Sequence, residues 1–345
     1  MITGAVLYDR LKDVKLGGTI CLFTPEKCEQ IAPIVNEIER LKKEHDAVIL
    51  AHSYVGPEII ATVADFSGDS YELSKSAKST TAKTIVFVAV KFMAETAKLL
   101  NPNKRVLMPS RNNGCTLADS ITGDDVKRLR LQYPDHTFVC YINTTVDVKA
   151  QCDVCVTSSN VYHIIETIPN DKIYFLPDRL MGQNVINALK AKGIEKEILL
   201  WNGTCYVHEE YDPDVIHYLR KEHPGLKVVS HPECNPGVVA QSDFVGSTSQ
   251  MLKFVADNSA PAYFMLTECG LTSRLQLEHP GKKFVGACTM CRYMKSNTLA
   301  DIARVLTSPD PIDEIHLDPA DVEAADRCIT RMFDYTNQSV HPNRT

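Results

Sequence analysis

Two cysteines stand three positions apart, Cys288 and Cys291, in the stretch GACTMCRYMK at residues 286–295. Such a pair can bind zinc, act as a redox dithiol, or supply a single useful thiolate. A second pair with the same spacing is Cys152 and Cys155, and 133 positions separate Cys155 from Cys288. This separation is far larger than in zinc fingers or zinc ribbons, so the pairs alone leave all three possibilities open.

Two further cysteines follow predicted strands, Cys115 in RNNGCTLAD and Cys205 in WNGTCYVHEE. Together with Cys291 they are 90 and 86 residues apart, although a spacing this even can also arise by chance. We infer three α/β units of similar size, each of which contributes one thiol to a common centre. Three thiolates could hold zinc, but zinc in a structural site normally takes four ligands, whereas a cubane iron–sulfur cluster held by three cysteines leaves one iron open.

The chain contains 12 cysteines, an even number. Its size and the absence of a signal-peptide pattern nevertheless argue against a disulfide framework. Six cysteines are interpreted as buried free thiols that pack like small hydrophobic residues: Cys21, Cys28, Cys140, Cys234, Cys269 and Cys328.

Composition limits the classes of function. The chain has 345 residues and 44% hydrophobic content, enough to fill two or three domain cores. A net charge of −6 and a pI near 6.0 give no basic field for a nucleic acid. No segment approaches the roughly 18 consecutive apolar residues of a membrane span, and the N-terminus lacks a basic region before an apolar run. We therefore expect a cytoplasmic protein with neither a nucleic-acid nor a membrane partner.

Short apolar, β-branched segments alternate with segments of helical periodicity. In the first helical segment Thr24 can cap the N-terminus and Pro25 suits the first turn. This alternation predicts an α/β fold with parallel sheets. The eleven predicted strands are 47–54, 84–90, 105–109, 137–143, 153–159, 172–178, 197–203, 227–233, 243–249, 262–268 and 283–287.

Most of the polar residues of these segments stand at the strand ends, in AHSY, YIN, TSS, WNG, HPE, GSTS and TECG. Open parallel sheets bind ligands just beyond the carboxyl ends of their strands. We therefore expect the chemistry there.

Between about residue 47 and residue 300 the sequence resembles quinolinate synthase, the iron–sulfur enzyme family of de novo NAD biosynthesis. No single motif carries the resemblance, but the combination and order are specific. The motifs are, in order, AHSYVGPEI, DFSGDSYELS, VKFMAETAKLLNP, GCTLAD, YINTTVDVKA, VTSSN, WNGTCYVHE, HPEC, GSTS, TECG and CRYMKSNTL.

The resemblance implies three αβα domains in a pseudo-threefold arrangement around a central active site. The expected domains are residues 1–117 with 301–345, residues 118–205 and residues 206–300. The resemblance also implies one 4Fe-4S cluster per chain, held by Cys115, Cys205 and Cys291.

The third expected ligand is the cysteine of a Cys-x-x-Met-Lys motif, which favours Cys291 over Cys288. Cys288 is then either a buried thiol or, in the absence of the cluster, a disulfide partner of Cys291. One departure is that Arg-Tyr-Met stands between Cys291 and Lys295, where a proline-containing tripeptide is commoner.

The reaction implied is the condensation of iminoaspartate with dihydroxyacetone phosphate to quinolinate, with loss of phosphate and two waters. The open iron of the cluster acts as a Lewis acid in such a reaction. Iminoaspartate is unstable in water, so a link to an aspartate-oxidising enzyme is also implied.

The resemblance assigns roles to the ends of two strands. His52 and Tyr54 alternate at a strand end, and they are expected to bind or protonate the substrate. Tyr141 and Asn143 repeat the alternation, and they are expected to recognise carboxylate and hydroxyl groups near the cluster. Without the resemblance, His52 would be interpreted as a core histidine.

Hydroxyl side chains are the expected anion-binding groups. Ser70 and Ser158 are assigned to a substrate carboxylate, and Ser247 and Thr248 to the triose phosphate. Each could instead be only the start of a helix.

The acid–base candidates are His231 and Glu233, which face the same way in an extended segment. Glu233 is assigned as the base that takes a proton from carbon. His208, three residues after Cys205, is placed beside the cluster, where the alternative role is a hydrogen-bond partner without chemistry.

Two other classes of function remain open from the sequence. One is a cluster-dependent hydro-lyase of the aconitase type, which needs no triose phosphate. The other is a non-catalytic iron–sulfur or zinc sensor, but no basic stripe or recognition helix is present to act as its effector.

Overall fold

The computed structural model describes residues 1–16 and 20–338, and three short parallel sheets organise the fold. In the first two sheets the first strand of the unit lies between the second and the third, and the fourth lies outermost. The strands of the first sheet are β3 (Ala47–His52), β4 (Phe66–Gly68), β5 (Thr84–Val88) and β6 (Arg105–Leu107), and those of the second are β7 (Thr137–Tyr141), β8 (Val154–Val156), β9 (Lys172–Leu176) and β10 (Glu197–Leu200).

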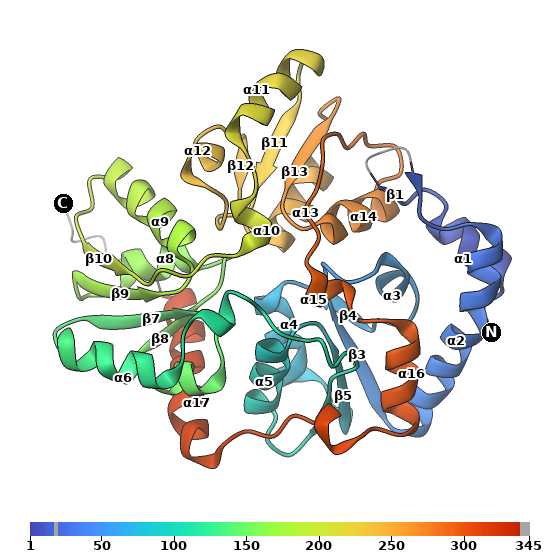
Figure 1. Cartoon of the computed structure of the whole chain (residues 1–345), viewed down its shortest axis with the longest axis horizontal. Coiled ribbons are helices and arrows are strands. Elements are labelled where there is room, and N and C mark those ends of the chain that lie inside the picture. Colours follow the sequence, from blue (N-terminus) through green and yellow to red (C-terminus); the bar gives the residue numbers. More distant parts are fainter. Residues whose placement is uncertain (17–19, 339–345) are drawn as a thin grey trace.

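The third sheet repeats this order with three strands, β11 (Lys227–Ser230), β12 (Phe244–Val245) and β13 (Tyr263–Leu266). In place of a fourth strand, Phe284 forms an isolated parallel bridge with Tyr263. Figure 1 shows the three units as separate lobes around a common centre. The predicted α/β fold with three αβα domains is confirmed.

Helices connect the strands, as parallel pairing requires. The helices are α1 (Gly4–Leu11), α2 (Pro25–Glu44), α3 (Pro57–Thr62), α4 (Ser70–Ser79), α5 (Lys91–Leu100), α6 (Gly123–Gln132), α7 (Val146–Ala150), α8 (Val161–Thr167), α9 (Arg179–Ala191), α10 (Tyr206–Glu209), α11 (Pro213–Glu222), α12 (Pro236–Val239), α13 (Thr248–Asp257), α14 (Cys269–Glu278), α15 (Arg292–Lys295), α16 (Leu299–Thr307) and α17 (Pro319–Thr336). As predicted, Thr24 caps α2 by accepting a hydrogen bond from the Lys27 N–H, and Pro25 is its first residue. None of the described helices is long and apolar enough to cross a membrane.

Ten of the eleven predicted segments contain a strand, and residues 283–287 form only the bridge at Phe284. Three short strands were not predicted: β4, and the antiparallel pair β1 (Lys15–Leu16) and β2 (Ile20–Cys21). β4 has three residues, and Phe66 at its start is exposed. Such a segment lacks the continuous apolar run by which buried parallel strands are identified.

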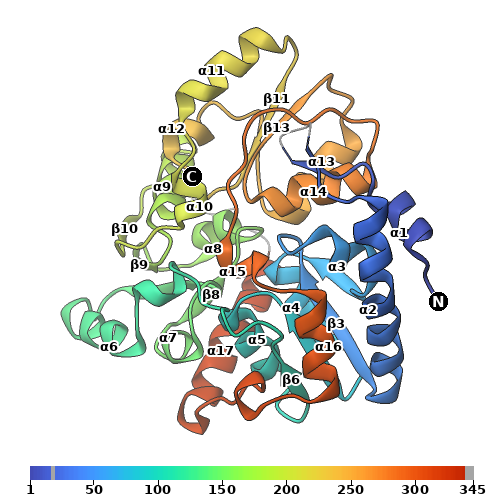
Figure 2. The same cartoon turned by 45° about the vertical axis from the view of Figure 1, so that its right-hand side comes forward.

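The two C-terminal helices pack on different domains. α16 packs against α2 and β5, whereas α17 packs against α7 and β8, and Figures 1 and 2 both show α17 beside the second sheet. We expected residues 301–345 to belong to the first domain. Residues 339–345 lie outside the part of the chain that the structure describes. α17 brings Ile329 and Cys328 into the core of the second domain, where the Cys328 sulfur lies 3.7 Å from the Cys140 sulfur.

The contact of α17 with the second sheet can be tested with Ile329→Ala. Ile329 is completely buried, so the substitution leaves a cavity and should cost about 2–5 kcal/mol of unfolding free energy. Trp201, the only tryptophan of the chain, follows β10 and reports unfolding of this domain by its fluorescence in urea. Glu323→Ala on the same helix removes only an exposed ion pair with Arg327 and should change stability by about 0.5 kcal/mol or less. Equal effects of both substitutions would contradict the packing.

Candidate active site between the three domains

One cavity collects side chains from all three domains. Thirteen of the fourteen residues predicted for the site line it: His52, Tyr54, Ser70, Cys115, Tyr141, Asn143, Ser158, Cys205, His208, His231, Glu233, Thr248 and Cys291. The remaining one, Ser247, is buried and does not line it. Its hydroxyl instead accepts a hydrogen bond from the Gln250 N–H as the N-cap of α13, the alternative role considered above.

Equivalent strands of the three sheets contribute equivalent chemistry. The ends of the first strands, β3, β7 and β11, carry the acid–base and aromatic pairs, and the residues after the second strands carry hydroxyls. Cys115 and Cys205 follow β6 and β10, the fourth strands of the first two sheets. Cys291 follows the bridge at Phe284, which takes the place of a fourth strand in the third sheet. The full set is His52 with Tyr54, Tyr141 with Asn143 and His231 with Glu233; Ser70, Ser158 and Thr248; and Cys115, Cys205 and Cys291.

A continuous hydrogen-bond network crosses the cavity wall. The Tyr141 hydroxyl donates to Glu233 Oε1 at 2.6 Å, and Glu233 Oε2 lies 3.2 Å from His208 Nδ1. His208 Nε2 lies 3.0 Å from the Thr267 hydroxyl, which is 2.6 Å from the Tyr54 hydroxyl. The network joins groups of all three domains, so the orientation of Glu233 depends on their relative placement.

Two buried histidines have the same backbone contact. The Tyr54 N–H donates to His52 Nδ1 at 3.2 Å, and the Glu233 N–H donates to His231 Nδ1 at 3.4 Å. Burial, the main cause, lowers the pKa of both rings to about 3, so both are neutral at physiological pH. In His52, where Nδ1 accepts, the ring proton is on Nε2, which makes the ring a hydrogen-bond donor at that atom. The Nδ1 atom of His231 also lies 3.4 Å from Glu233 Oε1.

Glu233 remains charged in spite of its position. Burial acts to raise the pKa of its carboxyl, but the adjacent His208 and His231, together with the hydrogen bond from Tyr141, outweigh this effect and lower the pKa below its ordinary value. Burial also raises the pKa of Tyr141 well above its ordinary value, so the phenol keeps its proton and continues to donate. The Glu233 carboxylate is therefore oriented by Tyr141 and His208 at the cavity wall.

The three predicted ligand cysteines share one local arrangement. Cys205 and Cys291 are the N-cap residues of α10 and α15. Burial raises the pKa of all three thiols, and nearby backbone N–H groups act to lower it: those of Leu117 and Ala118 at Cys115, of Val207 at Cys205, and of Tyr293 and Met294 at Cys291. These N–H groups favour negative sulfur, whereas burial raises the pKa of the Cys115 thiol to about 12. Three soft donors of this kind on one cavity fit an iron–sulfur cluster, whose iron supplies the missing positive charge.

A carboxylate holds the backbone of each of these cysteines, which sequence reasoning missed. The N–H groups of Cys115, Cys205 and Cys291 donate to Asp119 at 3.2 Å, Asp178 at 3.0 Å and Glu268 at 3.1 Å, respectively. Asp178 and Glu268 stand two residues after the third strands β9 and β13. The equivalent position of the first domain is Val90, so Asp119 of the cysteine loop itself takes this role. The strand-end segments KIYFLPD and TECG contained the signal for Asp178 and Glu268.

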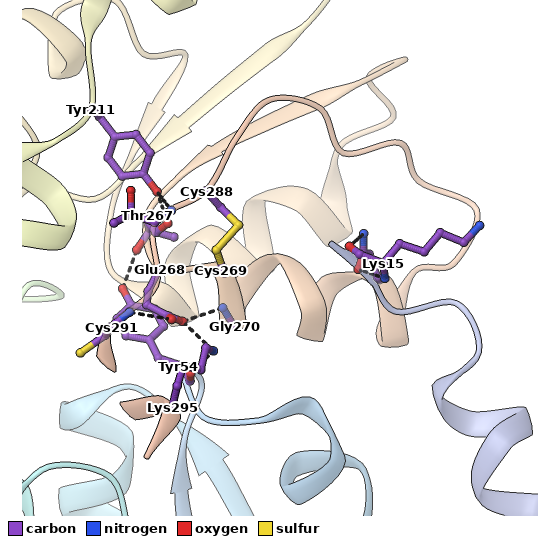
Figure 3. The surroundings of a disulfide bond; sticks show 12 residues. Lys15, Tyr54, Tyr211, Thr267, Glu268, Cys269, Gly270, Cys288, Cys291 and Lys295 are labelled. Atoms are coloured by element: carbon purple, nitrogen blue, oxygen red, sulfur yellow. Dashed lines mark hydrogen bonds and ion pairs between the residues drawn. A yellow bond between two sulfur atoms is a disulfide. The ribbon is translucent and has the colours of Figure 1, made fainter. Parts of the chain in front are cut away.

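Glu268 binds three groups at once (Figure 3). Besides the Cys291 N–H, it accepts hydrogen bonds from the Lys295 ammonium at 3.1 Å and the Gly270 N–H at 2.6 Å. Lys295 belongs to the quoted CRYMK motif, for which the sequence suggested no role. The ion pair fixes α15 and the loop of Cys291 against the start of α14.

The same loop carries a disulfide that the sequence did not predict. Cys288 is bonded to Cys269, the first residue of α14, and not to Cys291. The Cys291 sulfur points away from this disulfide (Figure 3), as a ligand in the cavity must. Two interpretations were therefore wrong: Cys269 is not a free thiol, and Cys288 has a partner other than Cys291. The interpretation of Cys21 was also wrong, because it is exposed in the short strand β2.

Arg292, in the unusual Arg-Tyr-Met tripeptide between Cys291 and Lys295, makes a backbone hydrogen bond. The Arg292 N–H donates to the Tyr206 hydroxyl at 2.9 Å, and that hydroxyl donates to the Met290 carbonyl at 3.3 Å. Proline at this position would lack the N–H. Tyr206 follows Cys205 directly, and its hydroxyl contacts Met290 and Arg292, the two neighbours of Cys291. The hydroxyl therefore links the Cys205 loop to the Cys291 loop.

Thr248 offers an unused donor in the cavity. Its hydroxyl is buried and has no hydrogen-bond partner among the described residues. It is the first residue of α13, whose N-terminal N–H groups favour an anion. Ser70 stands in the same position in α4. Both positions can hold a negatively charged group of a ligand.

The fold and the cavity together define a three-domain α/β protein whose site, at the junction of the domains, carries three thiols, buried histidines and a buried glutamate. The family profile described as NadA, Quinolinate synthetase A protein, matches residues 36–334. The chain belongs to this family.

Curated relatives cover most of the chain. Quinolinate synthase 2 of Mesorhizobium japonicum is 43% identical over 304 residues, 88% of this chain and 90% of the relative. Quinolinate synthase of Sinorhizobium medicae is 41% identical over 327 residues, 94% of this chain and 87% of the relative. Quinolinate synthase of Aquifex aeolicus is 42% identical over 313 residues, 89% of this chain and 95% of the relative.

The disulfide assignment can be checked by peptide mapping without reduction. In alkylated, cluster-free protein we expect one linked peptide pair that contains Cys269 and Cys288, with Cys291 alkylated. The bond closes a loop with a sequence separation of 19 residues, so Cys288→Ser should lower stability by about 3 kcal/mol or less. A peptide linked through Cys288 and Cys291 would contradict the assignment.

Proposed function

We propose that this chain is a quinolinate synthase that condenses iminoaspartate with dihydroxyacetone phosphate, with loss of phosphate and two waters. The observation that carries the proposal is the convergence on one cavity of three cysteines, one from each domain, beside an oriented carboxylate. Membership of the family and the names of the relatives support the same reaction.

Cys115, Cys205 and Cys291 are proposed to hold a 4Fe-4S cluster. When bound, it supplies one iron with an open coordination position, which polarises a substrate oxygen as a Lewis acid. Burial raises the pKa of the three thiols, and the backbone N–H groups that follow each cysteine act to lower it. A cluster in this position would lie beside His208 and Glu233, which line the same cavity.

Glu233 is proposed to be the base that removes a proton from a substrate carbon. Tyr141 and His208 hold its two oxygens, so the carboxylate is oriented before the substrate arrives. His52 and His231 are neutral, and each can donate a hydrogen bond from its ring N–H to a substrate oxygen. Tyr54, buried beside His52, is proposed to assist substrate binding.

The anionic groups of the substrates are proposed to bind at the strand ends that carry hydroxyls. Thr248, with its unpartnered buried hydroxyl at the start of α13, is proposed to bind the phosphate of the triose. Ser70, Ser158 and the Asn143 amide are proposed to bind the carboxylates of iminoaspartate. Ser247, which caps α13, is proposed to support the phosphate site at the start of that helix.

Iminoaspartate hydrolyses in water, so a reaction that oxidises aspartate must supply it close by. We propose that an aspartate-oxidising enzyme is the functional partner and that both act in the cytoplasm. The domain boundaries at residues 117, 205 and 300 also remain proposals.

The first experiment is an anaerobic assay for quinolinate from freshly generated iminoaspartate and dihydroxyacetone phosphate. Wild type and Cys288→Ser should form quinolinate and bind about four irons per chain, and Cys291→Ser should lose both. Cys288 is a matched control because it lies on the same loop but faces away from the cavity. An iron-replete wild type that forms no quinolinate would exclude the proposed reaction and favour another cluster-dependent lyase.

The role of the carboxylate predicts a separate effect on the chemical step. Glu233→Gln keeps the size of the side chain but removes the base, so kcat should fall by about 10²–10⁴-fold while the iron content stays at the wild-type level. Glu323→Gln, an exposed position on α17, should leave kcat unchanged. A loss of iron that parallels the loss of activity in Glu233→Gln would show that the residue acts on the cluster and not on the proton.

A further inference from the structure

Three donor atoms of different chemistry meet at one point of the cavity wall. The sulfur of Cys205, a ring nitrogen of His208 and a carboxylate oxygen of Glu233 all lie within 4.8 Å of one another. His208 and Glu233 are 3% and 2% exposed, respectively. Cys205 is the N-cap of the single-turn helix α10 and His208 lies within that helix, which gives a Cys-x-x-His spacing. Among the described residues, this is the one set of three such donors that is close enough to share an ion.

The distances and the neighbours fit a zinc ion. His208 Nδ1 and Glu233 Oε2 are 3.2 Å apart, and two ligands about 2.0–2.1 Å from a tetrahedral zinc are separated by about 3.3 Å. A zinc ligated through Nδ1 would leave the His208 proton on Nε2, where Thr267 Oγ1 lies at 3.0 Å as acceptor. The other oxygen of Glu233 already accepts from Tyr141. Both ligands therefore have the outer partners that orient zinc ligands in proteins.

We propose that the cluster-free protein binds one Zn²⁺ through Cys205, His208 and Glu233, with a fourth position open to the cavity. On binding, the Cys205 thiol and His208 Nδ1 release to solvent any proton that they carry, and the carboxylate coordinates as it stands. The three ligands are a thiolate, an imidazole and a carboxylate, which zinc accepts in this combination.

The zinc site and the cluster exclude each other, an inference that rests on the proposed function. Cys205 cannot serve both, and a zinc ion bound to Glu233 also occupies the proposed base. Zinc bound before cluster assembly should therefore block iron uptake and keep the protein inactive until the zinc is removed. The metal that binds first, iron or zinc, then decides whether the enzyme is active or inactive.

Two other thiol sets are the rivals for zinc. The first is Cys115 and Cys291 with Cys205, which come from three different domains. The second is the set of buried thiols in the second domain, Cys140, Cys152, Cys155 and Cys328, in which the sulfurs of Cys140 and Cys328 are 3.7 Å apart. This set is not among the groups of described residues that could hold a metal ion.

The experiment is zinc binding to anaerobically prepared, iron-free full-length protein, measured as bound metal after gel filtration. Wild type, Cys115→Ser and Cys155→Ser should each retain one Zn²⁺ per chain, and Cys205→Ser and His208→Gln should bind it at least about tenfold more weakly. Circular dichroism melting of each variant excludes unfolding as the cause. Co²⁺ in place of zinc should give the sulfur charge-transfer band of one thiolate ligand.

Three results would overturn the proposal. Loss of zinc in Cys115→Ser with retention in His208→Gln would place the ion among the three cluster cysteines. Loss in Cys155→Ser would place it in the set of buried thiols in the second domain. If wild-type protein takes up iron but binds no zinc, the zinc site is excluded and the proposed function is unaffected. If the protein binds zinc but never forms a cluster, the zinc site stands and the proposed function is excluded.

Discussion

A parallel sheet presents the carboxyl ends of all its strands at one edge, and this geometric constraint determines the rest of the structure. Three sheets with the same strand order turn that edge toward one centre, so residues distant in the chain become neighbours. The first strands deliver His52, Tyr141 and His231, and the segments after the fourth strands, or after the bridge at Phe284 in the third sheet, deliver the cysteines. The local fold of each unit is ordinary, and the chemistry arises from their juxtaposition.

The cysteine loops are held by hydrogen bonds whose partners lie outside the cavity lining or at its margin. Asp119, Asp178 and Glu268 each accept the N–H of one cysteine, and the Cys269–Cys288 disulfide and the Tyr206 hydroxyl add further ties on the third loop. Asp119 is exposed, but Asp178 and Glu268 are completely buried, and a buried charge is unfavourable unless it is compensated. Glu268 has Lys295 for this purpose.

Much of this arrangement was predictable from the sequence, for physical reasons. Buried parallel strands need apolar runs, so nearly all of them were identified, and even the segment at Phe284 was found although it pairs only as a bridge. The spacing of Cys115, Cys205 and Cys291 indicated three units. The partner of Cys288 was not predictable, because the pairing depends on the tertiary structure, which brings the loop that contains Cys288 next to Cys269 at the start of α14. The capping role of Ser247 was likewise hidden, since a cap and an anion site have the same local pattern.

The repetition of one topology three times also has a mechanical consequence. Each domain carries one sulfur, one hydroxyl and one strand-end pair of the cavity, so no domain contains a working part of the site alone. A small rigid rotation of a single domain displaces one member of each set together. The geometry of the ligands, the recognition of anions and the transfer of protons would thus all be impaired by the same movement. All three properties depend on how the three domains are placed relative to one another.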